Sequence, residues 1–132
     1  MKKGEIRTGL KPELKYTIMK RLSTGLHEFE TAADLEKYIN ENENVMVCCG
    51  RMGPMCLPVY ASMEILKNQF QHVAFYDMPF DHPEAHVIRM LPECRGFMGL
   101  PFTVYFKNGA PVKATTSIQT QDQVESILKA YY

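Results

Sequence analysis

Hydrophobic and polar positions alternate along the first half of the chain in blocks that predict strands and helices in turn. Residues 26–29 alternate with period two, which is typical of a strand, and Thr31 offers an N-cap to the helical pattern that follows. Residues 45–49 form an unbroken β-prone run, which favours a central strand buried on both faces. Apolar residues then recur at helical spacing over residues 59–70 and predict a long amphipathic helix.

The second half of the chain adds a strand, a short helix and a closing unit. Residues 72–77 predict the strand, and residues 78–82 predict a loop. Pro83 suits the first position of a short helix, which Pro92 ends. Two β-prone runs, residues 102–106 and 110–115, flank the pair Asn108-Gly109, which is typical of a tight hairpin turn.

A capping box opens the last predicted helix. Thr120 and Gln123 stand three residues apart, directly before an amphipathic run that reaches Tyr131. The complete order is βαβαβαββα. It predicts an α/β protein whose first strands pair in parallel and whose last two strands form an antiparallel hairpin.

The charge of the chain is balanced overall and uneven along its length. Fifteen Lys and Arg face fifteen Asp and Glu, so net charge indicates neither nucleic acid nor a membrane as partner. Residues 1–22 carry seven basic side chains against two acidic ones. We therefore divide the chain into a basic N-terminal extension, residues 1–24, and a single domain, residues 25–132.

The basic extension carries one helical signal. Leu14, Ile18 and Leu22 are spaced four apart after Pro12, which predicts a short amphipathic helix. Its apolar edge needs a cover, either the domain itself or a second copy of the chain. The second alternative predicts a homodimer through the extension.

The expected cellular compartment follows from two kinds of segment that the sequence does not show, a membrane span and a secretory signal. No apolar run approaches the ~20 residues that span a bilayer, and the basic N-terminus has no apolar segment of a secretory signal. We therefore expect a cytoplasmic protein without membrane contact, whose four cysteines are mostly reduced. No motif calls for a cofactor or a metal ion.

Three local motifs, in the right order and spacing, give the chain a resemblance to a known family. Residues 45–56 look like a central strand that runs into an active-site loop. Gly99-Leu100-Pro101-Phe102-Thr103 looks like a loop whose proline is cis and faces that site, and residues 106–109 look like a terminal hairpin. Together they resemble the thioredoxin family over residues 26–131. The resemblance implies a three-layer α/β/α sandwich around a central mixed sheet.

The same resemblance shows where the chain departs from the family. The family's site reads Trp-Cys-Gly-Pro-Cys; with its second cysteine placed on Cys56, Gly53 stands where the attacking cysteine belongs. With Gly53-Pro54 placed on the family's Gly-Pro instead, Met52 takes that position and the loop is one residue longer. Neither placement leaves a CxxC motif. The family's buried acid falls near Val47, which cannot transfer protons.

The main functional hypothesis is thiol redox or thiol-dependent client handling through Cys56. A cysteine at the start of a helix lies near unpaired N–H groups and a partial positive charge, which lower its pKa. Exchange also needs a second thiol to release a mixed disulfide. The candidates are Cys49, at the end of the central strand, and Cys94, in the loop before the proline motif. For Cys48 and Cys49, which point to opposite faces of the central strand, a simpler interpretation is that both are small buried apolar residues.

The competing hypothesis is a binding module without redox activity. Leu100 and Pro101 would present backbone groups to an extended peptide of a client protein, by β-augmentation. The loop Met52-Gly53-Pro54-Met55 would line the groove with adaptable methionines, and Met98 would join its rim. Met63, on the inward stripe of its helix, is expected in the core.

Two metal-binding alternatives carry less support. Met52, Met55, Cys56 and Met98 are soft ligands that suit Cu(I), although residue type is the only argument for that site. His82 and His86, next to Asp81, are spaced for a metal pair on a helix. Capping or surface roles explain these histidines more simply.

Overall fold

Five strands form one mixed sheet in the computed structural model, which describes residues 24–29 and 31–132. Their order in the sheet is β1-β3-β2-β4-β5. β1 and β2 both pair in parallel with β3, whereas β4 is antiparallel to β2 and to β5. The strands are β1 (His27–Glu28), β2 (Asn44–Gly50), β3 (Ala74–Pro79), β4 (Phe102–Lys107) and β5 (Ala110–Thr116).

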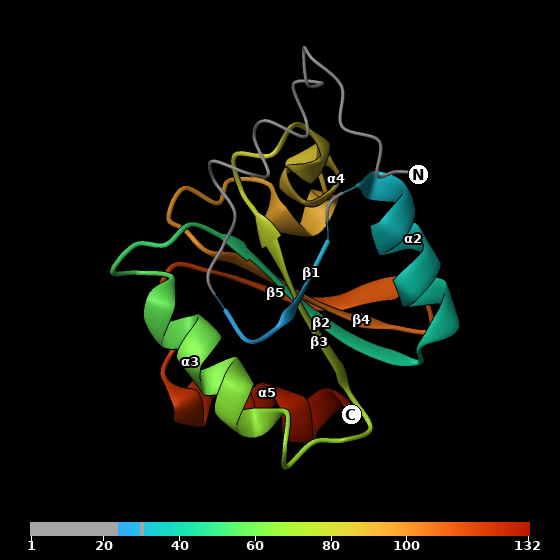
Figure 1. Ribbon diagram of the computed structural model, residues 1–132, viewed down its shortest axis with the longest axis vertical. Helices are drawn as coiled ribbons and strands as arrows, with labels where there is room; N and C mark the ends of the chain where they lie inside the picture. The colour runs from blue at the N-terminus through green and yellow to red at the C-terminus, as the bar shows by residue number, and fades with distance from the viewer. Residues whose placement is uncertain (1–23, 30) are drawn as a thin grey trace, which may run out of the picture.

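Helices cover both faces of the sheet, which confirms the predicted three-layer arrangement (Figure 1). α3 (Leu57–Leu66) and α5 (Gln121–Tyr131) pack together on one face. α2 (Ala32–Glu41) and α4 (His86–Arg89) lie on the other. Two short 3₁₀ helices, η1 (Pro83–Ala85) and η2 (Pro92–Cys94), flank α4.

The central strand β2 divides the core into two layers. All seven of its residues are buried, as the unbroken apolar run predicts. Because side chains alternate along a strand, Met46 and Cys48 join the core beneath α3 and α5. Val45, Val47 and Cys49 join the core beneath α2 and α4.

Most local signals of the sequence hold in the structure. The hydroxyls of Thr31 and Thr120 cap α2 and α5, and Thr120 forms the complete predicted capping box with Gln123. Asn108 and Gly109 turn the β4–β5 hairpin with positive φ angles of 52° and 84°. This is the conformation that makes Asn-Gly a favourable turn pair.

Three predicted boundaries are wrong. α3 ends at Leu66 and not at residue 70, because Gln69 and Phe70 turn back onto the Leu66 carbonyl. The predicted loop 78–82 begins later, since Met78 and Pro79 extend β3 by pairing with the end of β2. The helix between Pro83 and Pro92 is divided into η1 and α4.

The predicted helix of the basic extension, and with it the predicted homodimer contact, lies outside the described residues. The division into an extension and a domain therefore stays a prediction. In the part of the chain that the structure describes, no helix has the length and apolar character needed to cross a membrane.

Candidate thiol and peptide-binding site

Three groups from different parts of the chain converge on Gly50, the last residue of β2. A Cβ atom built on Gly50 would lie 2.8 Å from Sγ of Cys56, 3.0 Å from Cβ of Pro101 and 3.0 Å from the hydroxyl of Tyr60. The Leu100–Pro101 peptide bond is cis. The thiol, the proline and the phenol therefore pack around one stretch of backbone that has no side chain of its own.

Cys56 occupies the N-cap of α3, but its thiol is not the exposed, acidic thiol that the sequence predicts. The residue is 2% exposed, and its Sγ accepts the backbone N–H of Arg51 at 3.3 Å. Burial raises the pKa of the Cys56 thiol, although the Arg51 N–H and the Arg51 charge act in the opposite direction. The expected low pKa is wrong because desolvation outweighs the stabilisation that a helix N-terminus offers.

This burial predicts slow alkylation of Cys56. At pH 7 we expect iodoacetamide to label it more slowly than free cysteine, because a raised pKa leaves less thiolate and the surrounding loop shields Sγ. The labelling rate should still rise as the pH passes the ordinary thiol value of 9.0. Mass spectrometry of timed digests measures the rate, with urea-unfolded protein as control. Labelling faster than free cysteine at pH 7 would contradict this account.

The other cysteines are also buried and free, and they lie in both layers of the core. Cys48 shares the layer beneath α3 and α5 with Cys56. Cys49 and Cys94 share the opposite layer. Burial raises the pKa of Cys94 to about 11 and raises the pKa values of Cys48 and Cys49 as well. The structure therefore does not gather Cys56, Cys49 and Cys94 into one core layer.

Three exposed methionines belong to the two segments that meet at Gly50. Met52 and Met55, in the loop before α3, are 41% and 42% exposed, as expected for this loop, and Met98 is 93% exposed. Pro54 is exposed and Gly53 is half-buried in the same loop. Met63 is fully buried, as predicted from its helical spacing.

The loop that carries Leu100 is held from one side and open on the other. The Gly99 carbonyl accepts the Ser117 N–H at 3.1 Å and the hydroxyl of Thr116. The same Ser117 N–H also reaches the Pro101 carbonyl at 3.1 Å. Within the described residues, the backbone N–H and C=O of Leu100 take part in no hydrogen bond. These two groups are therefore available to a partner strand.

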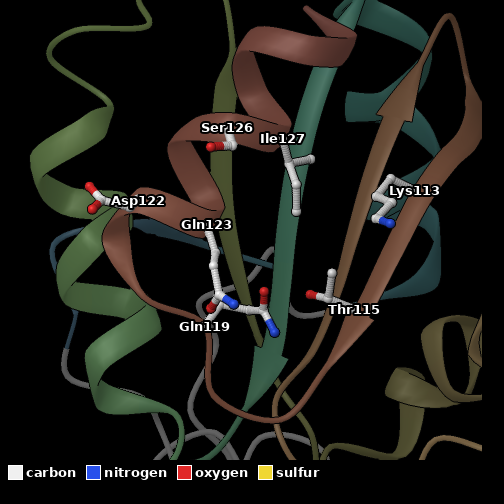
Figure 2. A pocket seen from close by; sticks show the side chains of 7 residues that line it. All are labelled: Lys113, Thr115, Gln119, Asp122, Gln123, Ser126 and Ile127. Atoms are coloured by element: carbon white, nitrogen blue, oxygen red, sulfur yellow. The ribbon is translucent and has the colours of Figure 1, made fainter.

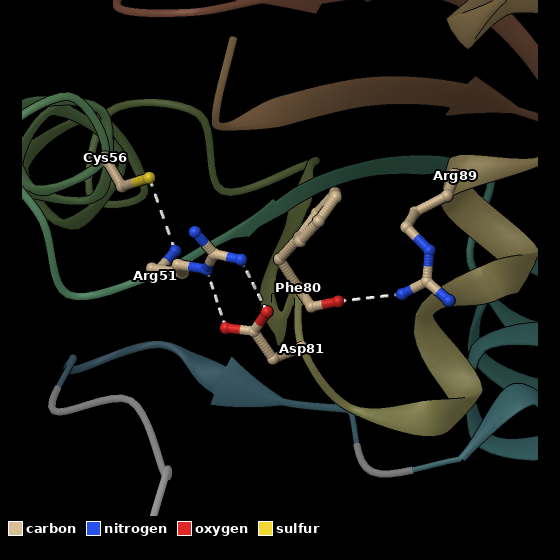
Figure 3. A network of polar contacts seen from close by, with 5 residues as sticks. All are labelled: Arg51, Cys56, Phe80, Asp81 and Arg89. Carbon is tan, nitrogen blue, oxygen red and sulfur yellow. Dashed lines mark hydrogen bonds and ion pairs between the residues drawn. The ribbon is translucent and has the colours of Figure 1, made fainter. Parts of the chain in front are cut away.

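An ion pair that the sequence analysis missed fixes the start of the site loop (Figure 3). Arg51 donates to both carboxylate oxygens of Asp81, at 2.6 and 2.7 Å. The Phe80 ring contacts the guanidinium groups of Arg51 and Arg89, at 5.6 and 5.4 Å from its centroid. Arg89 also donates to the Phe80 carbonyl at 2.8 Å. No local pattern predicts a pair between residues so far apart in the sequence.

A buried carboxylate lies one strand away from the position where the family resemblance places it. Asp77 on β3 is fully buried, pairs in register with Cys48, and accepts a hydrogen bond from the Thr24 hydroxyl. From the sequence, Asp77 is only the last residue of the predicted strand 72–77. A single acidic residue within the otherwise apolar run 73–78 was the signal available for it.

Tyr60 brings a polar group into the core layer that holds Cys48 and Cys56. Its hydroxyl is buried and has no hydrogen-bond partner among the described residues. Burial raises the pKa of the phenol, and the charges of Cys48 and Asp77 act in the same direction. The sequence offered no separate signal for Tyr60, because it follows the apolar stripe of α3 like a core residue.

The two histidines weighed as a metal pair have the local roles that the simpler interpretation expects. His82 is buried and its Nδ1 accepts the Glu84 N–H at 3.0 Å, which caps η1. Nδ1 of His86 lies 3.1 Å from the Pro83 carbonyl oxygen. Within residues 24–29 and 31–132, no group of three His, Cys, Asp or Glu side chains is placed to hold a metal ion.

Two hollows lie apart from the predicted site residues. One, of about 360 Å³, is formed between β5 and α5 by mainly polar side chains (Figure 2). The other, of about 450 Å³, has an apolar lining contributed by α2, the α4 region and the β4–β5 hairpin. Neither includes Cys56, Pro101 or the exposed methionines.

Comparison with known proteins identifies the fold. No family model matches the chain, and no curated protein matches it by sequence. Among solved structures, the thioredoxin of Plasmodium falciparum is similar with a TM-score of 0.68 at 17% identity, covering 81% of this chain and 100% of that one. Fasciola hepatica thioredoxin gives 0.68 at 22%, covering 81% and 100%. Oxidised mitochondrial thioredoxin 3 of Saccharomyces cerevisiae gives 0.67 at 16%, covering 80% and 94%. The chain therefore has the thioredoxin fold.

Proposed function

We propose that this protein is a thioredoxin-fold module that binds an extended peptide segment of a client protein at Leu100 and the methionine rim. The observation that carries the proposal is the open Leu100 backbone, next to Pro101 and thus in the segment that meets the loop before α3 at Gly50; the exposed Met52, Met55 and Met98 belong to these two segments. Main-chain hydrogen bonds to Leu100 supply affinity to any extended segment. The flexible thioethers adapt to different client side chains.

Burial of the thiol supports binding over redox chemistry. The nucleophile in thiol–disulfide exchange is the thiolate, and a buried thiol with a raised pKa supplies little of it at neutral pH. The chain also has Gly53 where a CxxC motif would have its first cysteine. A client is therefore held at this surface without being reduced.

A second candidate function is thiol exchange through Cys56. It is favoured by one observation: Sγ of Cys56 and the Pro101 ring both lie close to the position that a Cβ on Gly50 would take, and Sγ accepts the Arg51 N–H. In this reaction the thiolate of Cys56 attacks a client disulfide, the client S–S bond breaks, and one client sulfur leaves as a thiolate. The mixed disulfide is released by attack of a further thiol.

Peptide selection tests the proposed binding. A random peptide library displayed on phage is selected against the immobilised protein, and the affinity of the best peptide is measured by fluorescence anisotropy. We expect the double variant Met52→Gln/Met55→Gln to lose about tenfold in affinity, because it removes two apolar contacts from the rim. Met90→Gln, exposed in another part of the chain, is the matched control and should bind normally.

Two results separate the candidates. If no peptide is enriched, or if the Met52/Met55 double variant binds as tightly as the parent, the binding proposal fails. If instead client capture disappears with Cys56→Ser and insulin is reduced at an appreciable rate by the parent protein, thiol exchange is the better description.

A further inference from the structure

The sulfur that reaches solvent in the described residues is methionine sulfur, because the four cysteines are buried and four methionines are exposed. All four cysteines are at most 2% exposed. Met46, Met63 and Met78 are fully buried as well. Four other methionines reach solvent, namely Met52, Met55, Met90 and Met98. An oxidant that approaches the protein from solvent therefore meets methionine sulfur first.

Three of the exposed methionines belong to the two segments that meet at Gly50 and form the proposed peptide site. Met52 and Met55 belong to the loop between β2 and α3. Met98 stands two residues before Leu100, between Gly96, which has a positive φ of 84°, and Gly99, whose carbonyl is anchored to Ser117. Met90, at the end of α4, is the one exposed methionine of the described residues outside this surface.

We propose that Met98, together with Met52 and Met55, is a modification site at which hydroperoxides form methionine sulfoxide and thereby release the client. The inference rests on the proposed peptide binding and names how that binding is regulated. The thioether sulfur attacks the outer peroxide oxygen, the O–O bond breaks, and an S–O bond forms. Sulfur is oxidised by two electrons and the peroxide is reduced to water or an alcohol, so no further reactant is needed.

Oxidation changes the character of the rim. A sulfoxide is polar and chiral, whereas a thioether is flexible and apolar. An apolar client side chain that packs against the thioether must, after oxidation, pack against an S=O group whose hydration is lost on binding. Client affinity therefore falls, while the buried core methionines and cysteines keep the fold intact.

Peptide mapping of peroxide-treated protein tests the site itself. After short pulses of hydrogen peroxide, we expect Met98 to gain oxygen at least about tenfold faster than Met46 or Met63, with all four cysteines unmodified at that stage. Met90 should also react, because it is exposed, and it serves as the internal control for exposure. Cysteine oxidation that precedes Met98 oxidation, or equal rates for Met98 and Met63, would overturn the proposal.

Binding of the library-selected peptide tests the consequence. We expect peroxide treatment to weaken binding about tenfold in the parent and in Met90→Leu. The triple variant Met52→Leu/Met55→Leu/Met98→Leu keeps the apolar rim, cannot accept oxygen there, and should bind equally before and after treatment. If the triple variant loses binding to the same extent as the parent, the proposal is wrong. If the untreated parent selects no peptide, the proposed function fails instead, and the mapping result stands separately.

Discussion

Replacement of Gly53 by Cys is expected to give this protein disulfide reductase activity. Among the described residues, a Cβ built on Gly53 meets no heavy atom within 4 Å other than its chain neighbours, so a Cβ has room there. The Gly53 carbonyl accepts the N–H groups of Cys56 at 3.1 Å and Leu57 at 2.9 Å, which places residue 53 in the turn that leads into α3. A thiol at that position lies near the partially positive N-terminal end of α3, which lowers its pKa.

The existing thiol then has a partner. Residues three apart on a helical turn face the same side, so a thiol at position 53 lies on the side of Cys56. The new thiolate attacks a client disulfide, and Cys56 displaces the reduced client as a disulfide forms between positions 53 and 56. Burial of Cys56 is compatible with this second step, because the mixed disulfide that Cys56 attacks forms at position 53, next to the Cys56 thiol. We expect the insulin reduction rate to rise at least ~100-fold over the parent protein.

Two variants control this experiment. Gly53→Ser adds a side chain of similar size without a thiol and should stay inactive. Gly53→Cys combined with Cys56→Ser retains the attacking thiol, lacks the second one, and should accumulate a mixed disulfide that mass spectrometry detects. If Gly53→Cys forms no disulfide with Cys56 under oxidising conditions, the assignment of the two positions to one helical turn is incorrect.

The fold could be predicted from the sequence because its signals are local. The unbroken apolar run 45–49 requires burial on both faces, and β2 has it. The caps at Thr31 and Thr120 and the turn at Asn108-Gly109 each depend on residues no more than three apart. Boundaries are less certain because tertiary pairing decides them: β3 continues to Pro79 since the end of β2 pairs with it.

The site could be predicted only in outline because its properties come from distant segments. The position of Cys56 at a helix start is local, and the structure agrees with it. The Cys56 thiol is buried where Gly50 and Pro101, from other parts of the chain, come close to it, so the helix N-terminus alone gave the wrong pKa direction. The Arg51–Asp81 pair is equally non-local.

Substitution of Gly50 by Val is expected to disrupt the site more than any change in its exposed rim. A Cβ alone would stand 2.8 Å from Sγ of Cys56 and 3.0 Å from Cβ of Pro101, and real Cβ atoms do not approach other atoms so closely. Neither neighbour is the end of a flexible side chain, because Pro101 is a ring and Sγ belongs to a short buried side chain. The branched side chain of Val adds two further methyl groups to this space.

The strain has no easy outlet on the β3 side, because Gly50 is held there by two backbone contacts. It pairs with Pro79 at the end of the parallel β2–β3 ladder, and its carbonyl accepts the Phe80 N–H at 2.8 Å. Overpacking of such a site costs about 1–3 kcal/mol of the free energy of unfolding. We expect Gly50→Val to lie in the upper part of that range and to abolish binding of the library-selected peptide, since the loop of Pro101 must move away.

Urea unfolding followed by far-UV circular dichroism measures this loss in a chain that contains no tryptophan. Gly53→Ala is the matched control: it adds a Cβ into open space three residues further along the same loop and should leave the unfolding midpoint unchanged. Gly50→Ala adds the crowded Cβ without the extra methyl groups, and its unfolding midpoint should lie between those of Gly50→Val and Gly53→Ala. An unchanged midpoint for Gly50→Val would mean that Cys56 and Pro101 do not pack on the end of β2. If they do pack there, the Val side chain has no room unless one of them moves. The thiol, the proline loop and the peptide site all depend on that contact.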